Sequence, residues 1–292
     1  MKQTNTPLPL RLYTHNIRYA TTHPFPHESP WPTRLPRIVS SIIYTQHQHP
    51  STLLCLQEVL HTQLLSILSL LPRSYSYIGH ARDDGHEAGE YSPVIYDTAV
   101  WHLDQWRSKW LSQTPGRPSK GWDAACIRIL TVGYFTHRES GRQVVVLNTH
   151  LDDQGTIARR ESARMIVEEV RGILGEGEGG GEGEGRGVIL AGDMNSPEGD
   201  DAYRVLTAPG SLLRDARADV PPEKRYGHQN TFSGFGNEGV VPQRIDFVFA
   251  AEEEGGREAS WKITNYSVLE NKFDDGIYSS DHRPVVVDLF LS

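Results

Sequence analysis

Two spacings of apolar residues alternate along the chain. Short apolar runs of strand length recur from one end to the other, and longer segments with apolar residues at helical spacing lie between them. The short runs predict strands over residues 10–17, 52–56, 75–79, 94–96, 127–135, 144–148, 188–190, 245–250 and 285–291. The longer segments predict helices over residues 37–47, 60–71 and 158–174. Strands with adjacent helices in both halves predict one α/β domain over residues 1–292, with its helices outside.

Segments rich in proline, glycine or charge separate these elements. Residues 21–36 contain five prolines, which predicts an irregular loop rather than a helix. Residues 175–187 consist of glycine, glutamate and one arginine, so they cannot build a core and predict a flexible loop. Residues 252–258 are similarly polar and predict a hairpin loop.

Composition and charge narrow the class of protein. Lys+Arg number 29 against 37 Asp+Glu, and the resulting net charge of -8 argues against a large basic face for tight, non-specific nucleic-acid binding. The net charge does not exclude a local basic groove. No stretch reaches the roughly 20 apolar residues of a membrane-spanning helix, and the N-terminal segment lacks the pattern of a secretion signal. We therefore expect an intracellular monomer, cytoplasmic or nuclear, with no membrane partner.

The two cysteines exclude further classes of site. Their number excludes a disulfide framework, and their spacing excludes a cysteine-based zinc site. Both Cys55 and Cys126 lie in short apolar runs, so both are expected to be buried strand thiols.

Polar side chains of a particular kind follow the predicted strands. A strand that ends in a polar residue delivers that side chain to the edge of the sheet, where ligands bind in α/β folds. The residues at such positions are amides, carboxylates and two histidines, namely Asn16, Glu58, Asn148, His150, Asp193, Asn195, Asp246, Asp281 and His282. Hard oxygen ligands of this kind select Mg²⁺ or Mn²⁺. Carboxylates and histidines beside such a cation suit hydrolysis at phosphorus.

Six short motifs in this order resemble the endonuclease/exonuclease/phosphatase superfamily, which includes DNase I and exonuclease III-type enzymes. The motifs are Thr14-His15-Asn16-Ile17-Arg18, Gln57-Glu58-Val59, Asn148-Thr149-His150-Leu151-Asp152, Gly192-Asp193-Met194-Asn195, Arg244-Ile245-Asp246-Phe247 and Ser280-Asp281-His282-Arg283-Pro284. The resemblance extends over residues 10–291. A closer resemblance is to a branch of the family that carries Arg82-Asp83-Asp84-Gly85, Gly89-Glu90-Tyr91-Ser92-Pro93 and Trp122-Asp123-Ala124-Ala125.

The resemblance implies both a fold and a set of roles. The fold is a four-layered α/β sandwich, in which two packed mixed β-sheets are flanked by helices and the site lies at one rim. The family pattern assigns metal binding to Asn16, Glu58 and Asp281. It assigns catalysis to His150, Asp193, Asn195, Asp246 and His282, with Asp193 positioning the attacking water and Asp246 orienting His282.

Some of the residues expected to bind the substrate come from the branch-specific motifs. The expected contacts are Arg18, Arg82, Glu90, Tyr91, Trp122 and Asn148. For some of them a structural role competes with the functional one. Arg82 could be a surface charge or a phosphate contact through its planar guanidinium. Trp122 could belong to the core or stack on a planar group of the substrate.

The sequence therefore predicts a Mg²⁺- or Mn²⁺-dependent phosphoester hydrolase that uses activated water. The first hypothesis is a phosphodiesterase or nuclease, with single-stranded nucleic acid as a candidate substrate. The alternative is a phosphatase or phosphodiesterase for a small phosphorylated metabolite or an RNA end. A more remote alternative is a binding protein that keeps the fold without the chemistry. The fold alone does not choose among these, because substrate specificity lies in the walls of the site.

Overall fold

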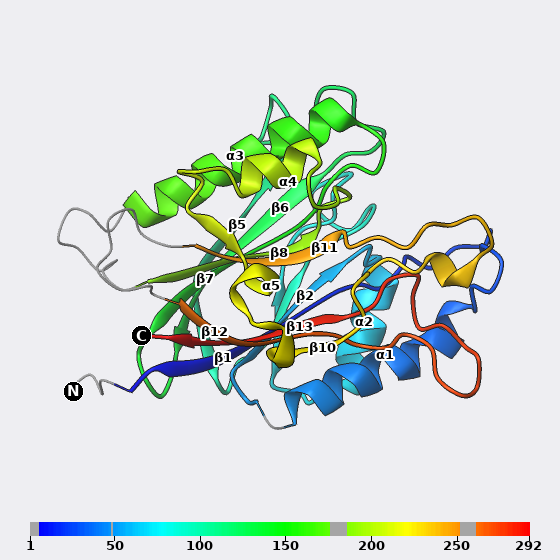
Figure 1. Ribbon diagram of the computed structural model, residues 1–292, viewed down its shortest axis with the longest axis horizontal. Helices are drawn as coiled ribbons and strands as arrows, with labels where there is room; N and C mark the ends of the chain where they lie inside the picture. The colour runs from blue at the N-terminus through cyan, green and yellow to red at the C-terminus, as the bar shows by residue number, and fades with distance from the viewer. Residues whose placement is uncertain (1–5, 48, 176–185, 252–260) are drawn as a thin grey trace.

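In the computed structural model, residues 6–47, 49–175, 186–251 and 261–292 are described, and their strands form two mixed sheets (Figure 1). The first sheet has seven strands, in the order β10 (Arg225–Gly227), β12 (Trp261–Val268), β13 (Val285–Leu291), β1 (Leu8–Asn16), β2 (Thr52–Gln57), β4 (Val94–Asp97) and β3 (Tyr75–Ile78). The second has six, in the order β5 (Trp101–Trp110), β6 (Ile129–His137), β7 (Gln143–His150), β8 (Gly187–Asp193), β11 (Asp246–Ala251) and β9 (Leu213–Asp215).

Helices cover the outer face of each sheet. α1 (Trp31–Gln46) and α2 (His61–Leu70) lie on the first sheet, and α3 (Thr156–Gly175) and α4 (Asp201–Leu206) lie on the second (Figure 1). Short helical turns, α5 (Ala216–Asp219), η1 (Pro222–Lys224) and η2 (Gly234–Gly236), occupy connections. The four-layered α/β sandwich expected from the sequence is thus confirmed. Among the described residues, no helix is long and apolar enough to cross a membrane.

Alternation along each central strand builds three apolar layers. In β2, Leu53 and Cys55 pack between the two sheets, whereas Leu54 and Leu56 pack beneath α1 and α2. The same alternation divides β7 and β8 between the layer that joins the sheets and the layer beneath α3. Successive side chains of a strand point to opposite faces, so a strand buried on both sides reads as a continuous apolar run. These are the runs that the sequence identified.

The proline-rich segment is where the sequence prediction was wrong. Residues 21–36 were expected to be irregular, but α1 begins at Trp31. Pro32 lies in the first turn, where a backbone N–H has no helical partner to lose. Pro36 removes one hydrogen bond further along, and the buried Arg34 stabilises this turn through its guanidinium, which donates to the carbonyl groups of Ser29, Ile17, Arg18 and Ser279. Tertiary contacts thus outweigh the local signal.

Two long strands escaped the sequence analysis for a common reason. β5 and β12 each contain a register shift, between Leu103 and Gln105 in β5 and between Ile263 and Asn265 in β12. An extra residue in a strand breaks the two-residue periodicity from which strands are recognised. The predicted loops at residues 175–187 and 252–258 fall mostly or wholly outside the described residues.

A pair of buried amides joins the two sheets beneath one rim. Gln57 at the end of β2 donates through Nε2 to Asn148 Oδ1 in β7 at 2.8 Å, and Asn148 Nδ2 donates to the carbonyls of Leu56 and Pro93, both at 2.8 Å. Asn148 is fully buried. Asn148 was expected to contact the substrate, and its side-chain oxygen and nitrogen instead form hydrogen bonds within the protein.

We predict that Asn148→Ala lowers the free energy of unfolding by about 3 kcal/mol, because it removes three buried hydrogen bonds, with Gln57, Leu56 and Pro93. Urea unfolding measures the change. Asn265→Ala removes an asparagine on the exposed face of β12 and is the matched control, with an expected change of at most about 0.5 kcal/mol. Equal stabilities of the two variants would contradict the structural role of Asn148.

Candidate active site

The polar strand ends meet at one rim of the two sheets. β1 and β2 run parallel, β1 ends at Asn16, and Glu58 directly follows β2. β7 and β8 also run parallel and end at His150 and Asp193, which pair in register. β11 begins at Asp246, opposite Asp193. Because parallel strands present their carboxyl ends at the same edge, the side chains that follow them converge.

The side chain of Asn16 connects the carboxylates of the two sheets. Its Nδ2 donates to Glu58 Oε1 and to Asp193 Oδ2, both at 2.9 Å, while its Oδ1 accepts from the backbone N–H of Arg18 at 3.0 Å. Glu58 also accepts from the backbone N–H of Tyr19. Asn16 was expected to bind a metal, but its amide N–H₂ faces the carboxylates. This geometry makes Asn16 a donor that positions two acids.

Backbone strain concentrates at this rim. Arg18, Glu58 and Asn195 have φ angles of 56°, 57° and 45°, in the left-handed region that side-chain-bearing residues rarely adopt. Each such conformation costs on the order of 1 kcal/mol and persists only where surrounding contacts impose it. The strained residues turn their side chains into the site directly after buried strands.

His282 forms a buried pair with Asp246. Its Nδ1 lies 2.8 Å from Asp246 Oδ2, and its Nε2 lies 3.7 Å from Asp193 Oδ2. Burial disfavours the charged imidazole, but Asp246 and Asp193 outweigh burial and raise the pKa of His282 well above its ordinary value. Burial and the charge of Asp246 raise the pKa of Asp193 to about 7. The arrangement therefore holds an imidazolium, with Nδ1–H donating to Asp246, beside a second acid.

His150 has the opposite electrostatic character. Asn195 Nδ2 lies 3.0 Å from His150 Nε2, and because an amide N–H₂ only donates, Nε2 accepts and the proton lies on Nδ1. Burial, together with the positive charges of Arg128 and Arg82, lowers the pKa of His150 well below its ordinary value. His150 is thus neutral, and its Nδ1 faces Glu90 Oε2 at 3.8 Å.

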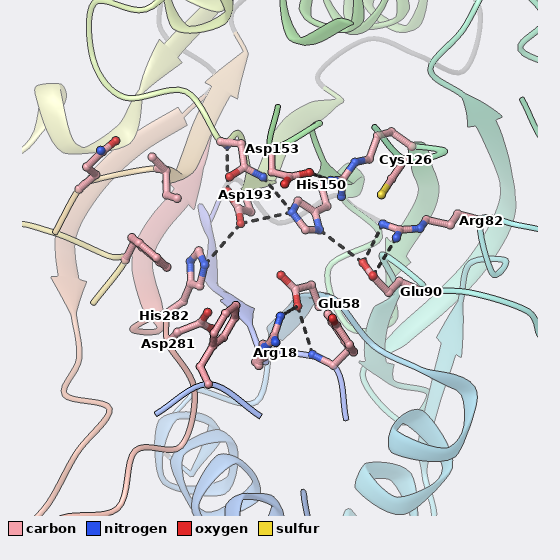
Figure 2. A pocket seen from close by; sticks show the side chains of 17 residues that line it. Arg18, Glu58, Arg82, Glu90, Cys126, His150, Asp153, Asp193, Asp281 and His282 are labelled. Carbon is pink, nitrogen blue, oxygen red and sulfur yellow. Dashed lines mark hydrogen bonds and ion pairs between the residues drawn. The ribbon is translucent and has the colours of Figure 1, made fainter. Parts of the chain in front are cut away.

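Most of these residues line a cavity of about 590 Å³. Figure 2 shows His282 and Asp281 on one side of it and Arg82, Glu90 and Cys126 on the other, with Asp193, His150 and Glu58 between. Its walls are formed by Arg18, Tyr19, Phe25, Glu58, Arg82, Glu90, Cys126, Arg128, His150, Asp153, Asp193, Asn195, Phe232, Gln243, Ile245, Asp281 and His282.

The arginines of the cavity wall are each paired with carboxylates. Their partners are Glu28 and Glu58 for Arg18, Glu90 for Arg82, and Asp152 and Asp153 for Arg128. The Arg82–Glu90 pair is bidentate, with both N–O distances at 2.8 Å. Burial and the charge of Glu58 still raise the pKa of Glu90 to about 7, although Arg82 acts against them. Positively and negatively charged side chains therefore lie next to one another along the cavity wall.

The sequence profile of the endonuclease/exonuclease/phosphatase family matches residues 13–282. The chain belongs to this family. The resemblance inferred from the six motifs is confirmed, and the protein is a hydrolase of this family with a buried Asp/His cluster suited to a metal ion.

Solved structures of this family extend the comparison. A family protein from Bacteroides thetaiotaomicron is 30% identical, covers 99% of this chain and 97% of its own, and superposes with a TM-score of 0.84. The mannosyl-6-phosphatase of B. thetaiotaomicron VPI-5482 is also 30% identical, with coverage of 96% and 99% and a TM-score of 0.81. D. rerio TDP2 with a single-strand DNA product shares the fold at 15% identity, coverage of 96% and 98%, and a TM-score of 0.69. No curated protein sequence matches the chain significantly.

The family implies a divalent metal, and the residues of the rim fit one. Asp193 and Asp281 are buried acids whose pKa values are raised, first by burial. Asp246 Oδ1 is buried with no hydrogen-bond partner in the described chain, and ligand atoms of Asp193, Asp246 and His282 lie within 4.8 Å of one another. A divalent cation would neutralise this group of acids, and their hard oxygen atoms match the preference of Mg²⁺ or Mn²⁺.

The structure brings together most of the residues named from the sequence. Asn16 and Asp246 lie behind the cavity wall, while the larger set lines the cavity itself, namely Arg18, Glu58, Arg82, Glu90, His150, Asp193, Asn195, Asp281 and His282. Tyr91 does not line it, because the phenol is buried against His61 and donates to the carbonyl of His86. Trp122 lines a separate groove beside α3.

Sequence analysis missed a group of residues on the wall near Arg82. Arg128, Asp153 and Cys126 line the cavity there. Cys126 was expected to be a buried strand thiol, but it lies in the loop before β6 and is partly exposed, so that expectation was wrong. Asp152 and Asp153 continue the motif that contains His150, which is a signal that could have been followed. Arg128 lies in the predicted strand over residues 127–135, and no motif in the sequence marks it as a residue of the site.

Asp152 organises the loop that carries Arg128 and Cys126. Its carboxylate accepts backbone N–H groups at 2.7–3.1 Å from Ala125, Cys126, Gln154 and Gly155. Burial would raise its pKa, but these N–H groups and Arg128 outweigh burial and lower the pKa of Asp152 from 3.8 to about 2. A carboxyl group whose pKa is lowered by folding stabilises the folded state above its unfolded pKa, and that contribution disappears as the pH falls through the folded pKa.

We predict that Asp152→Asn is less stable than wild type by about 2 kcal/mol at pH 7, because the amide cannot accept all these N–H groups. The difference should shrink as the pH falls from about 4 to about 2. Denaturant unfolding of both proteins across this range measures it. A difference that stays constant down to about pH 2 would show that the charge of Asp152 contributes nothing.

Proposed function

We propose that the protein is a Mg²⁺- or Mn²⁺-dependent phosphatase for small, hydroxyl-rich phosphomonoesters such as sugar phosphates. The observation that carries the proposal is the pairing of every cavity arginine with a carboxylate. A polynucleotide needs a row of cations along its backbone, whereas mixed donors and acceptors suit hydroxyl groups. The 30% identity to a mannosyl-6-phosphatase over nearly the whole chain supports the same choice.

The residues of the rim divide the chemistry among them. Glu58 and Asp281, which line the cavity beside the cluster of Asp193, Asp246 and His282, would hold the divalent ion, and the bound ion would neutralise charge on the phosphoryl oxygens. Asp193 orients the attacking water and accepts its proton, which its raised pKa favours. His282, held by Asp246, donates from Nε2 to a phosphoryl oxygen as negative charge builds up. Asn195 orients neutral His150 beside Asp193 by donating to His150 Nε2, and Asn16 keeps Glu58 and Asp193 at a fixed separation.

A phosphodiesterase or nuclease remains the second candidate because of the aromatic side chains at the cavity. Phe25 is 53% exposed and, like Phe232, lines the cavity. Such rings can stack on a nucleobase. Nucleic-acid binding that falls steeply with added salt, together with cleavage of single strands, would favour this function over the sugar-phosphate phosphatase. A binding protein without chemistry is disfavoured, because the expected catalytic positions are all filled.

We predict hydrolysis of small phosphomonoesters that requires Mg²⁺ or Mn²⁺ and is abolished by a chelator. Asp193→Asn and His282→Ala should each lower kcat by about 100-fold or more, the scale expected for loss of a general acid or base. Phosphate release across sugar phosphates, aryl phosphates, single-stranded DNA and RNA measures this. His102→Ala, an exposed histidine of β5, is the control and should retain full turnover. Near-normal turnover in both site variants would refute the mechanism.

We also predict that Mn²⁺ raises the melting temperature of the wild-type protein, because binding to the folded state alone stabilises it. Glu58→Gln should remove most of this increase, since it removes a negative charge from the metal ligands. Thermal unfolding at a series of Mn²⁺ concentrations provides the measurement without relying on activity. An undiminished increase in Glu58→Gln would place the metal elsewhere.

A further inference from the structure

One end of the cavity lies beyond His150, away from His282, and its composition differs from that of the catalytic rim. Figure 2 shows Arg82, Glu90 and Cys126 at this end. Arg128 and Asp153 also line the cavity, and Asp153 pairs with Arg128. We call this group of five residues the polar end. Neither the family motifs nor the mechanism above gives a role to Arg128 or Asp153.

Arg128 is held rigidly and has one unused donor. Its Nε donates to Asp152 Oδ2 at 3.3 Å and its Nη2 donates to Asp153 Oδ1 at 2.8 Å. Its Nη1 is buried and has no hydrogen-bond partner among the described residues, and the side chain as a whole is only 5% exposed. A buried donor without a partner costs on the order of 1–3 kcal/mol. Because the guanidinium is planar and fixed by two acids, Nη1 cannot turn away to find another acceptor.

Asp153 supplies an acceptor beside this donor. Its side chain is 49% exposed, and Arg128 takes only one of its oxygens at close range. The other oxygen contacts Gln154 Nε2 at 3.4 Å. A donor next to an acceptor is complementary to two neighbouring hydroxyl groups, each of which can both accept and donate.

The charges of the polar end argue against a second anionic group at this position. Arg82 and Arg128 face Glu90 and Asp153, with Asp152 directly behind. These acids offset both cations, so the polar end offers no net positive charge to an added phosphoryl or carboxylate group. A metal held by Cys126 with these acids is disfavoured as well, because the Asp152 carboxylate already accepts four backbone N–H groups and Arg128.

We propose that Arg128 and Asp153 select the substrate by binding two neighbouring hydroxyl groups of its phosphate-bearing portion, Arg128 Nη1 donating to one and Asp153 accepting from the other. This inference rests on the proposed phosphatase activity and specifies its substrate class as polyhydroxyl phosphomonoesters. A site that hydrogen-bonds a substrate hydroxyl discriminates strongly against an analogue that lacks it, because the buried polar groups are then left unpaired.

The kinetic test compares the best substrate from a panel of hexose and pentose phosphates with its monodeoxy analogues and with phenyl phosphate. In the wild type, removing either of the two contacted hydroxyls should lower kcat/KM by about 30-fold or more. Arg128→Lys keeps the positive charge beside Asp152 but loses Nη1, and Asp153→Asn loses the carboxylate at a half-exposed position. Each should lower the ratio of kcat/KM for the sugar phosphate to that for phenyl phosphate by about 10-fold or more. Each should also flatten the preference among the deoxy analogues.

Arg107→Lys is the matched control, because Arg107 pairs with Glu169 outside the cavity, and its ratio should equal that of the wild type. Unchanged ratios in both Arg128→Lys and Asp153→Asn would overturn the inference while leaving the phosphatase proposal intact. Hydrolysis of phenyl phosphate with no sugar phosphate accepted would do the same. Absence of all monoester hydrolysis by the wild type would instead refute the proposed function.

A second measurement is independent of turnover and uses Cys126 as a reporter. The chain contains two cysteines, and Cys55 is fully buried, so alkylation of the folded protein reports on Cys126. With the metal chelated, the best sugar phosphate should slow alkylation saturably in the wild type, whereas phenyl phosphate should protect less. Asp153→Asn and Arg128→Lys should lose this protection. Equal protection by both ligands, or none by the sugar phosphate, would overturn the proposed recognition of hydroxyls even if a variant failed to fold.

Discussion

The active-site geometry depends on one amide group, the side chain of Asn16. Glu58 belongs to one sheet and Asp193 to the other, and Asn16 Nδ2 donates to both at 2.9 Å. Two acids that share one amide would otherwise repel each other. The amide offsets that repulsion and fixes the distance between the sheets at the rim, and the Gln57–Asn148 pair fixes it one layer deeper. Every other catalytic side chain is placed relative to these two sheets.

The two histidines show how position sets the charge of the same side chain. His282 lies between Asp246 and Asp193 and stays protonated, whereas His150 lies near Arg128 and Arg82 and stays neutral. A cationic donor thus stands on one side of Asp193 and a neutral, oriented imidazole on the other. Their difference follows from their neighbours, since both histidines are buried to a similar extent.

In the proposed function, the walls of the cavity restrict the substrate more than the catalytic rim does. The arginines are already paired with carboxylates, which is the feature that favours a single phosphoryl group over a polyanion in our proposal. The polar end adds fixed donors and acceptors that match hydroxyl groups. In the proposed function, catalysis and selection occupy adjacent parts of one cavity, held by different loops, so specificity can change while the rim stays the same.

The sequence by itself determined the buried strands, the three longest helices and the polar residues that follow strands, because two-residue and helical periodicities are local. β2 and β8 were recognised because both are buried on their two faces and read as unbroken apolar runs. Local signals failed in the first turns of α1, where the buried Arg34 donates to carbonyls of other segments, and at the register shifts of β5 and β12, which break the two-residue periodicity. Only the tertiary structure decided that Asn148 and Tyr91 serve the core, and that Arg128, Asp153 and Cys126 line the cavity, because the direction of a loop side chain is set by contacts between residues far apart in sequence.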